Sequence, residues 1–376
     1  MSEYQYYEFQ AIDRPLTNQE IAELRACSSR ASITATRFVN HYDWGDLKGD
    51  PAIWMERYFD AFLYLASWGT HEVVIRLPRK AFDLRTAQRY CCGRAASARA
   101  HGKFVILELI SENDDGYRDE QDDNESGWLS SLVPLRNDLI AGDMRAFYLA
   151  WLLCAQSGDL DDDAIEPPVP AGLGNLTAPL QALTDFLRID AHLLAVAAAR
   201  SSAIETSFSE SDVKQWITAL SESEKTGWLL RLVTGQEPHV RAELLRQIRE
   251  SRPPQKSSSN QVPRTVQALL EEASRQATAE KIRREREAAE ERTRYLDDLA
   301  KREALVWEQV DALVLTKQRS SYDEAASLLR DLRDLASRDG HDAIFEERIL
   351  RIRKEHGRKV GLIERLQREG LLPPYR

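Results

Sequence analysis

Short runs of aromatic and β-branched residues recur through the first third of the chain, separated by polar or proline-containing segments. Runs of this kind are typical of β-strands. The runs that we expect to form strands cover residues 4–12, 33–42, 72–77 and 103–110. With helices between them, they predict a small α+β domain over residues 1–110, in which helices pack on one face of a sheet.

Two helix-start signals fall between these runs. Thr17 and Glu20 have the spacing of a capping box, in which each side chain accepts a hydrogen bond from the other residue's backbone N–H. Asp50 stands before Pro51, so an N-capping carboxylate precedes a proline that fits the first helical position. We expect a helix after each signal, and the apolar spacing extends the second one to about Ser67.

From residue 127 onward, apolar residues recur every three or four positions, which is the period of an amphipathic helix. Gly142 and Gly158 break this pattern, and Ser221 is a plausible cap for a later segment. No block repeats at a fixed period, so residues 127–252 predict an irregular helical bundle rather than a solenoid. The expected fold class is therefore an α+β N-terminal domain followed by a mostly α-helical chain.

Proline and serine separate this bundle from the rest of the chain. They make residues 253–263 a linker, because proline removes backbone donors and serine adds little burial. Residues 264–316 contain no glycine or proline, and opposite charges three or four positions apart predict a long charged helix. Ile282, Ala289 and Leu296 are seven residues apart, so a dimerising coiled coil stands beside the interpretation as a single exposed helix.

Three more amphipathic segments follow within residues 320–372, and we expect them to form a small C-terminal helical module. Between positions 348 and 368, eight basic residues stand against two acidic ones. These candidate partner-binding residues are Arg348, Arg351, Arg353, Lys354, Arg358, Lys359, Arg365 and Arg368. They would meet phosphates, an acidic protein or the chain's own acidic segment, or else form a solvated surface.

The acidic segment itself covers residues 111–126 and holds eight carboxylates against one arginine. Repulsion at this charge density favours a solvated surface loop. A cation site or a contact with a basic partner is the alternative. The residues after Gly116 do not follow the spacing of a calcium-binding loop, so we expect no metal there.

Composition narrows the class of protein. The chain has 376 residues, of which 43% are hydrophobic and 30% charged, so a buried core is expected. No apolar run approaches the ~18 residues of a membrane helix, and the first residues do not resemble a signal peptide. The four cysteines lack paired spacing, which fits a reducing cytoplasm. The net charge of −10 does not attract nucleic acid to the chain as a whole.

Motifs of known chemistry are missing from the sequence. It contains no phosphate-binding GxxxxGK[ST] loop, no GxSxG elbow and no CxxC pair. Cys91 and Cys92 are adjacent, so both can hardly enter one tetrahedral zinc site, and we interpret them as inert thiols. Pairing of either with His71 or His101 has no support from spacing. We therefore assign no catalytic, cofactor-binding or metal-binding residue, and expect no cofactor.

One cluster remains as a surface to test for a peptide or small ligand. Residues 40–46 and 68–71 gather polar and aromatic side chains at the ends of expected strands, where loops often carry function. The simpler interpretation is that the aromatic residues fasten the predicted helix of residues 51–67 to the sheet.

Longer stretches carry a resemblance. The segments MSEYQYYEFQAIDRPLT, NHYDWGDLKGDP and YFDAFLYLASWGT resemble a family of uncharacterised bacterial cytoplasmic proteins. The pattern YDEAASLLRDLRDLA followed by KVGLIERLQREGL is similar to the end of bacterial proteins with a SWIM-type zinc finger. No cysteine follows Cys154, so the finger itself is missing. The resemblance implies a shared helical tail that docks in a multi-protein system, and it transfers no functional residue.

We expect from these features a non-enzymatic adaptor or scaffold that assembles one or more proteins in a bacterial cytoplasm. The alternative is a nucleic-acid-associated accessory protein that uses the basic residues of 348–368. A third hypothesis is an enzyme with a site near Trp44 and His71. A homo-oligomer formed through the long helix is compatible with the first two.

Overall fold

The computed structural model describes residues 4–80, 84–112, 127–203, 210–234, 240–251, 262–316 and 318–372. The chain forms two compact units, Met1–Ala277 and Thr278–Arg376. A sheet with helices makes the first unit and helices alone make the second, which confirms the predicted fold class. Within the described ranges, no helix is long and apolar enough to span a membrane.

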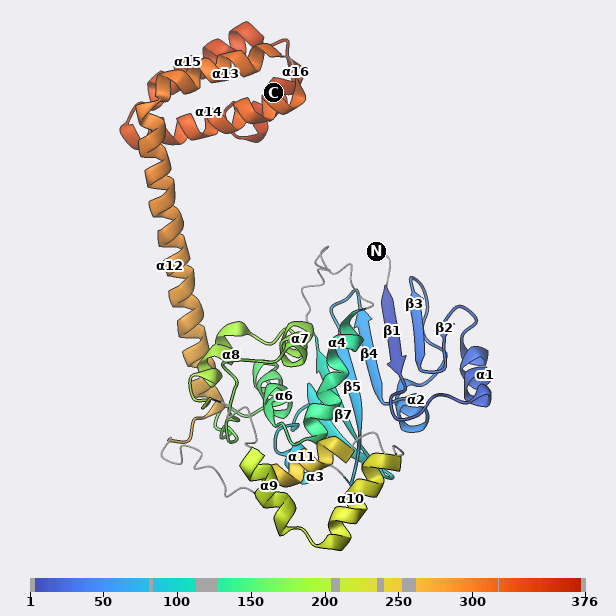
Figure 1. Ribbon diagram of the computed structural model, residues 1–376. Helices are drawn as coiled ribbons and strands as arrows, with labels where there is room; N and C mark the ends of the chain where they lie inside the picture. The colour runs from blue at the N-terminus through green and yellow to red at the C-terminus, as the bar shows by residue number, and fades with distance from the viewer. Residues whose placement is uncertain are drawn as a thin grey trace. The chain divides into compact units, whose positions relative to one another are not determined.

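The first unit is built on one antiparallel sheet (Figure 1). Among the described residues it has seven strands in the order β2-β3-β1-β4-β5-β7-β6. The strands are β1 (Gln5–Gln10), β2 (Ser32–Ile33), β3 (Arg37–Tyr42), β4 (Ala61–Ala66), β5 (His71–Pro78), β6 (Ala96–His101) and β7 (Phe104–Ser111). The central strand β1 pairs with β3 on one side and with β4 on the other, with Tyr7 opposite Asn40 and Tyr64.

Helices cover both faces of this sheet, so the prediction of helices on one face is wrong. On one face, Tyr7 and Phe9 pack in an aromatic core with helices α1 (Asn18–Cys27) and α2 (Pro51–Arg57). The opposite face, to which Tyr6 belongs, packs against the helices that follow the sheet. The alternation of side chains along a strand sends neighbouring residues into different cores.

The capping box of Thr17 and Glu20 is confirmed at the start of α1, and Asp50 caps α2 as predicted. The prediction that the second helix reaches Ser67 is wrong, because α2 ends at Arg57 and β4 begins at Ala61. Phe62 lies in one core and Leu63 in the other. A strand buried on both faces has no apolar–polar alternation, so its sequence resembles a helix segment.

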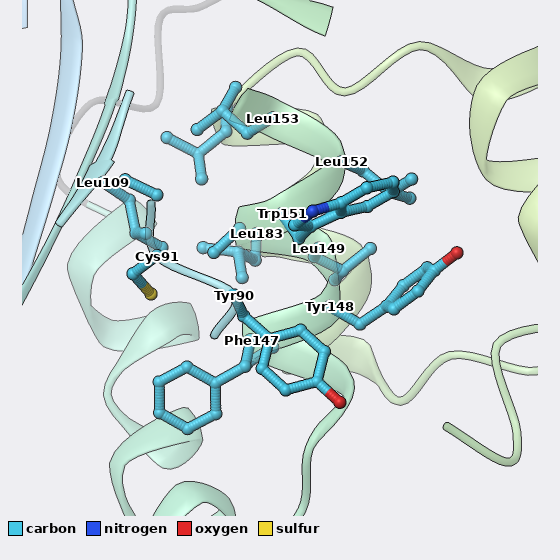
Figure 2. Close-up of a cluster of buried hydrophobic side chains, with 14 of the residues drawn as sticks. Tyr90, Cys91, Leu109, Phe147, Tyr148, Leu149, Trp151, Leu152, Leu153 and Leu183 are labelled. Atoms are coloured by element: carbon cyan, nitrogen blue, oxygen red, sulfur yellow. The ribbon is translucent and has the colours of Figure 1, made fainter. Parts of the chain in front are cut away.

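Helix α3 (Leu84–Gln88), between β5 and β6, and helices that follow the sheet complete the larger core. The helices that follow are α4 (Trp128–Leu132), α5 (Pro134–Ile140), α6 (Arg145–Gln156), α7 (Ala178–Phe186), α8 (Ala191–Ala198), α9 (Glu210–Ala219), α10 (Glu222–Thr234) and α11 (Val240–Ser251). Of these, α9 and α10 place no described residue in this core. Figure 2 shows Phe147, Leu149 and Leu153 of α6 within this core, together with Leu109 of β7. Residues 1–110 and the bundle therefore share one core.

Helix α12 (Val266–Lys301) begins in the first unit, where Val266, Leu269 and Ala273 are buried. Its middle is exposed and carries i,i+4 ion pairs such as Arg283–Glu287 and Arg286–Glu290, in agreement with the predicted charged helix. The boundary between the two compact units lies within α12. Most of the predicted linker, residues 253–261, lies outside the described residues.

The second unit packs the end of α12 with α13 (Glu303–Thr316), α14 (Arg319–Asp339), α15 (Asp342–His356) and α16 (Val360–Arg368). The helix predicted for 264–316 is thus two helices, which meet at Arg302. Gly340 ends α14 with a φ of 72°, a left-handed conformation that favours glycine. Trp307 of α13 lies in the same core as Phe345 of α15, so the predicted module shares its core with helices that precede it.

Candidate functional site

Several of the eight predicted partner-binding residues bind within the second unit itself. The Arg348 guanidinium lies 4.8 Å from the ring centroid of Trp307. The Lys359 ammonium donates to the carbonyl oxygen of Val314 at 2.8 Å, and so holds the turn after α15 against α13. These two cations stabilise helix packing.

Asp323 of α14 binds two more of the eight. Arg365 approaches its carboxylate at 2.5 Å and Arg368 at 3.4 Å. Both arginines lie on α16, so the two ion pairs link α16 to α14. A further member of the eight, Arg353 of α15, is half-buried. Formal charge in the sequence therefore overstates the positive charge that faces solvent.

The other three, Arg351, Lys354 and Arg358, are exposed. Their spacing of three and four residues places them on one side of α15 and of the turn that follows it. No ion pair involves them within the described residues. Leu350 lies on the same side and is 57% exposed. We call Leu350, Arg351, Lys354 and Arg358 the α15 basic face.

A second unusual surface lies on α10. Leu229, Leu232 and Val233 stand at positions i, i+3 and i+4, and their exposed fractions are 61%, 46% and 83%. Leu230, beside them, is 59% exposed, and no residue of α10 is buried. We call Leu229, Leu230, Leu232 and Val233 the α10 stripe. Single exposed apolar residues are common, but several on one helix indicate a binding surface.

Local interactions explain why α10 forms without a buried face. Ser221 and Glu224 make a reciprocal capping box at its start, and the hydrogen bonds from Ser221 lower the pKa of the Glu224 carboxyl. Arg231 lies over the Trp228 ring at 4.6 Å and pairs with Glu243 of α11 at 2.6 Å. These contacts tie α10 to α11 through polar groups.

The loop around Trp44 is fixed to the sheet through one glutamine. The Gln5 side-chain amide donates to the Gly45 carbonyl at 3.1 Å and to the Asp46 carboxylate at 2.8 Å. Its oxygen accepts from the hydroxyls of Tyr7 (2.7 Å) and Tyr64 (2.9 Å). Trp44 is 74% exposed. The polar groups, rather than this tryptophan, therefore attach the loop to the sheet.

A carboxylate with a raised pKa lies on the sheet face that carries Tyr64. Glu72 of β5 stands opposite Tyr64, and Glu108 of β7 stands opposite Val74, two residues farther along β5. Burial raises the pKa of Glu72 to about 7, and the negative charge of Glu108 adds to the effect. Glu72 can therefore hold or release a proton near neutral pH.

His71 does not join this group. It precedes Glu72 in the strand, so its side chain points to the other face. Its Nδ1 lies 2.7 Å from the Phe186 carbonyl oxygen and its Nε2 lies 2.5 Å from the Arg188 guanidinium. An Nδ1–H tautomer satisfies both contacts. His71 and the loop of Trp44 therefore do not converge on one catalytic site.

The cysteines have an arrangement that spacing did not reveal. Cys92 is exposed, whereas Cys91 and Cys154 are buried. The Cys92 thiol donates to the Tyr90 carbonyl oxygen at 3.8 Å, and the Cys154 thiol donates to the Ala96 carbonyl oxygen at 4.0 Å. The same Ala96 oxygen accepts from the N–H of Gly93, the residue after Cys92, at 3.2 Å, so the two thiols lie near each other. His101 lies 3.3 Å from Glu56 instead of meeting a cysteine. In the described part of the chain, no group of three or more His, Cys, Asp or Glu side chains is arranged to hold a metal ion. The acidic loop, apart from Ser111 and Glu112, lies outside that part.

No protein-family model, curated protein or solved structure matches this chain. The resemblance to uncharacterised bacterial proteins and to the SWIM-associated tail stays a prediction, as does a homo-oligomer through α12. The α10 stripe was not predicted from the sequence, because WLLRLV has the apolar spacing of a helix that is packed in a bundle, where such a face would be buried.

Proposed function

We propose that this protein is a non-enzymatic adaptor that binds a partner protein through the α10 stripe. The observation that carries the proposal is the exposure of Leu229, Leu230, Leu232 and Val233 on a helix that buries none of its side chains. Removing one such side chain from water gains about 1.5–3 kcal/mol, so a partner that covers the stripe gains several times that amount before its entropic costs.

The partner chemistry that fits the stripe is an amphipathic α-helix with basic residues at one end. Positions i, i+3 and i+4 form the ridge that a second helix packs against. The first turn of α10 is acidic: the side chain of Glu222 is 89% exposed, and Glu224 follows. A partner helix would place apolar residues on Leu229 and Val233 and basic residues on this turn.

The α15 basic face is the second surface of the proposed adaptor. It lies on a compact unit with its own core, so both surfaces are presented by independently packed parts of the chain. Its chemistry, three cations beside Leu350, suits an acidic segment of a second protein. An adaptor needs two such surfaces of different chemistry to hold two different partners.

Nucleic-acid binding remains the second candidate function, and the three exposed cations of the α15 basic face favour it. They would contact phosphates, and each phosphate contact adds about 0.9 to the salt dependence of binding. The five other basic residues are less available, since four of them bind groups inside the second unit.

Site-specific photocrosslinking tests the adaptor. A benzoylphenylalanine at position 229 or 233 of the full chain is irradiated in cells, and positions 305 and 315 are the controls. Leu305 and Leu315 are 66% and 65% exposed on α13, outside the stripe. We expect one dominant heterologous adduct at 229 and 233 that contains an amphipathic helix at the crosslinked position. Equal adducts at all four positions, or adducts only with a second copy of the chain, would overturn the proposal.

A further inference from the structure

The loop after α3 brings two adjacent cysteines to the surface of α6. The Cys91 N–H donates to the Ala87 carbonyl at 2.9 Å, which continues the last turn of α3 and directs Cys91 into the core (Figure 2). The next residue, Cys92, is exposed. Cys154 of α6 has no exposed surface, and its thiol lies 4.0 Å from the Ala96 carbonyl oxygen, which also accepts from the N–H of Gly93, the residue after Cys92. A reagent from solvent therefore meets the Cys92 thiol before it can reach the buried Cys154 thiol.

The loop is held in this position by Asp159, which follows α6. Its carboxylate accepts from the Ala95 N–H at 2.6 Å and lies 3.6 Å from the Arg94 guanidinium. A Cβ added at Gly93 would come within 2.4 Å of the Asp159 carboxylate, so glycine is required for this close approach. The contact of Cys92 with Cys154 is thus fixed by the backbone on both sides of the pair.

We propose that Cys92 and Cys154 form a thiol modification site, in which a hydroperoxide oxidises Cys92 and Cys154 then closes a reversible disulfide. In the first step the Cys92 thiolate attacks the O–O bond, takes the terminal hydroxyl as a sulfenic acid and releases an alcohol or water after protonation. In the second step the Cys154 sulfur attacks Cys92, and the hydroxyl leaves with the Cys154 proton as water. The hydroperoxide is the two-electron oxidant.

The titration behaviour of the pair agrees with these roles. A hydrogen bond from Cys154 lowers the pKa of Cys92, against the opposing effect of burial. The same hydrogen bond and burial raise the pKa of Cys154. The exposed sulfur is therefore the one that meets the hydroperoxide and forms the thiolate more readily, and the buried sulfur supplies the proton that the second step needs. Burial raises the pKa of Cys91 as well, which leaves that thiol unreactive.

The test uses the reduced full chain, treated with an equivalent of hydrogen peroxide, alkylated with N-ethylmaleimide and mapped by mass spectrometry. We expect a Cys92–Cys154 disulfide within one chain, alkylated Cys27, and reversal by dithiothreitol. Before oxidation, Cys92 should react with the maleimide about tenfold faster than the half-buried Cys27. A Cys91–Cys92 bond, a bond between chains, or equal reactivity of Cys92 and Cys27 would overturn the proposal.

Two variants separate the steps. Cys154→Ser should leave Cys92 as a sulfenic acid that dimedone captures, whereas Cys27→Ser should form the disulfide as the unchanged chain does. Cys91 and Cys92 share one tryptic peptide, so Cys91→Ala removes the ambiguity of assignment. If Cys91→Ala does not fold, fragmentation of the unchanged chain's linked peptide assigns the bond. Dimedone labelling that is the same with and without Cys154 would show that this residue does not resolve the sulfenic acid.

Discussion

Arg264 holds Glu166 by two hydrogen bonds, from Nε at 3.0 Å and from Nη2 at 2.7 Å, although the residues are 98 positions apart. The side chain of each is only 4% exposed. The Tyr148 hydroxyl also donates to Glu166, and the neighbouring Ile165 makes a β-bridge with Thr265. The pair therefore fixes the chain just before α12 to the sheet unit.

Removing one partner of this pair should destabilise the first unit strongly. Arg264→Ala leaves the buried Glu166 carboxylate with only one cation among the described residues, the more distant Arg200 guanidinium 3.7 Å away, and should cost up to about 3–5 kcal/mol. We expect the urea transition of the first unit to move to lower concentration. Lys214→Ala is the control, because its ion pair with Glu210 is exposed and contributes little. Equal effects of the two substitutions would contradict a structural role for the Arg264–Glu166 pair.

Stability should depend on pH through Glu72. Its folded pKa of about 7 lies above its ordinary value, so the folded state binds the proton more tightly than the unfolded chain. The stabilisation from this tighter proton binding is fully present below the ordinary pKa of a glutamate side chain, and it is lost as the pH rises through about 7. Glu72→Gln keeps the group neutral and should stabilise the fold by up to about 3 kcal/mol at alkaline pH, with little change at acid pH.

Thermal unfolding of the Glu72→Gln variant across the pH range measures this effect. Glu112→Gln is the control, since Glu112 follows the neighbouring strand β7 and is exposed. A stabilisation that is the same at acid and alkaline pH would mean that ionisation of Glu72 is not its cause.

The α10 stripe should tolerate charge in the free protein. Leu229→Asp and Val233→Asp change exposed side chains, so we expect the melting temperature to shift little and solubility to rise. Leu183→Asp in the core of the first unit should unfold that unit. Circular dichroism and a thermal melt compare the three. A large loss of stability in the first two would show that the stripe is packed inside the protein.

Substitutions in the α15 basic face test whether this surface binds a protein or a nucleic acid. If it binds nucleic acid, the affinity should fall with salt with a logarithmic slope of about −3, and Arg351→Glu with Lys354→Glu and Arg358→Glu should abolish binding. Arg30→Glu with Lys48→Glu, on exposed residues of the first unit, is the control. Fluorescence anisotropy with single- and double-stranded probes measures both. Salt-independent binding, or binding unchanged by the triple substitution, removes the nucleic-acid candidate.

Local signals in the sequence were the most informative. The Thr17–Glu20 capping box was predicted because its partners are three residues apart, and Ser221 was predicted as a plausible cap; both cap helices in the structure. The secondary structure of segments that are buried on two faces was harder to predict. The run of β4 has apolar residues on both sides, and only the strands beside it show that it is not a helix. The edge strand β6 was missed, because Ser97 and Arg99 give it no apolar pattern.

The candidate sites depend on contacts that spacing does not encode. The basic residues of 348–368 were counted correctly, but Asp323, whose carboxylate binds Arg365 and Arg368, lies about forty residues earlier in the chain. Cys92 and Cys154 are also distant in sequence, and only the fold of α3 and α6 brings their sulfurs together. The α10 stripe has the pattern of a core helix, and its exposure follows from the absence of a covering element among the described residues.

The affinity of the crosslinked partner, purified and measured by titration calorimetry, tests the adaptor most directly. Each fully buried leucine or valine contributes about 1.5–3 kcal/mol, and 1.4 kcal/mol is tenfold in Kd. Leu229→Asp with Leu232→Asp and Val233→Asp should therefore weaken binding at least about a hundredfold, whereas Leu305→Asp with Leu315→Asp should leave it unchanged. Equal affinity of the unchanged chain and the stripe variant would contradict the proposal that α10 binds the partner.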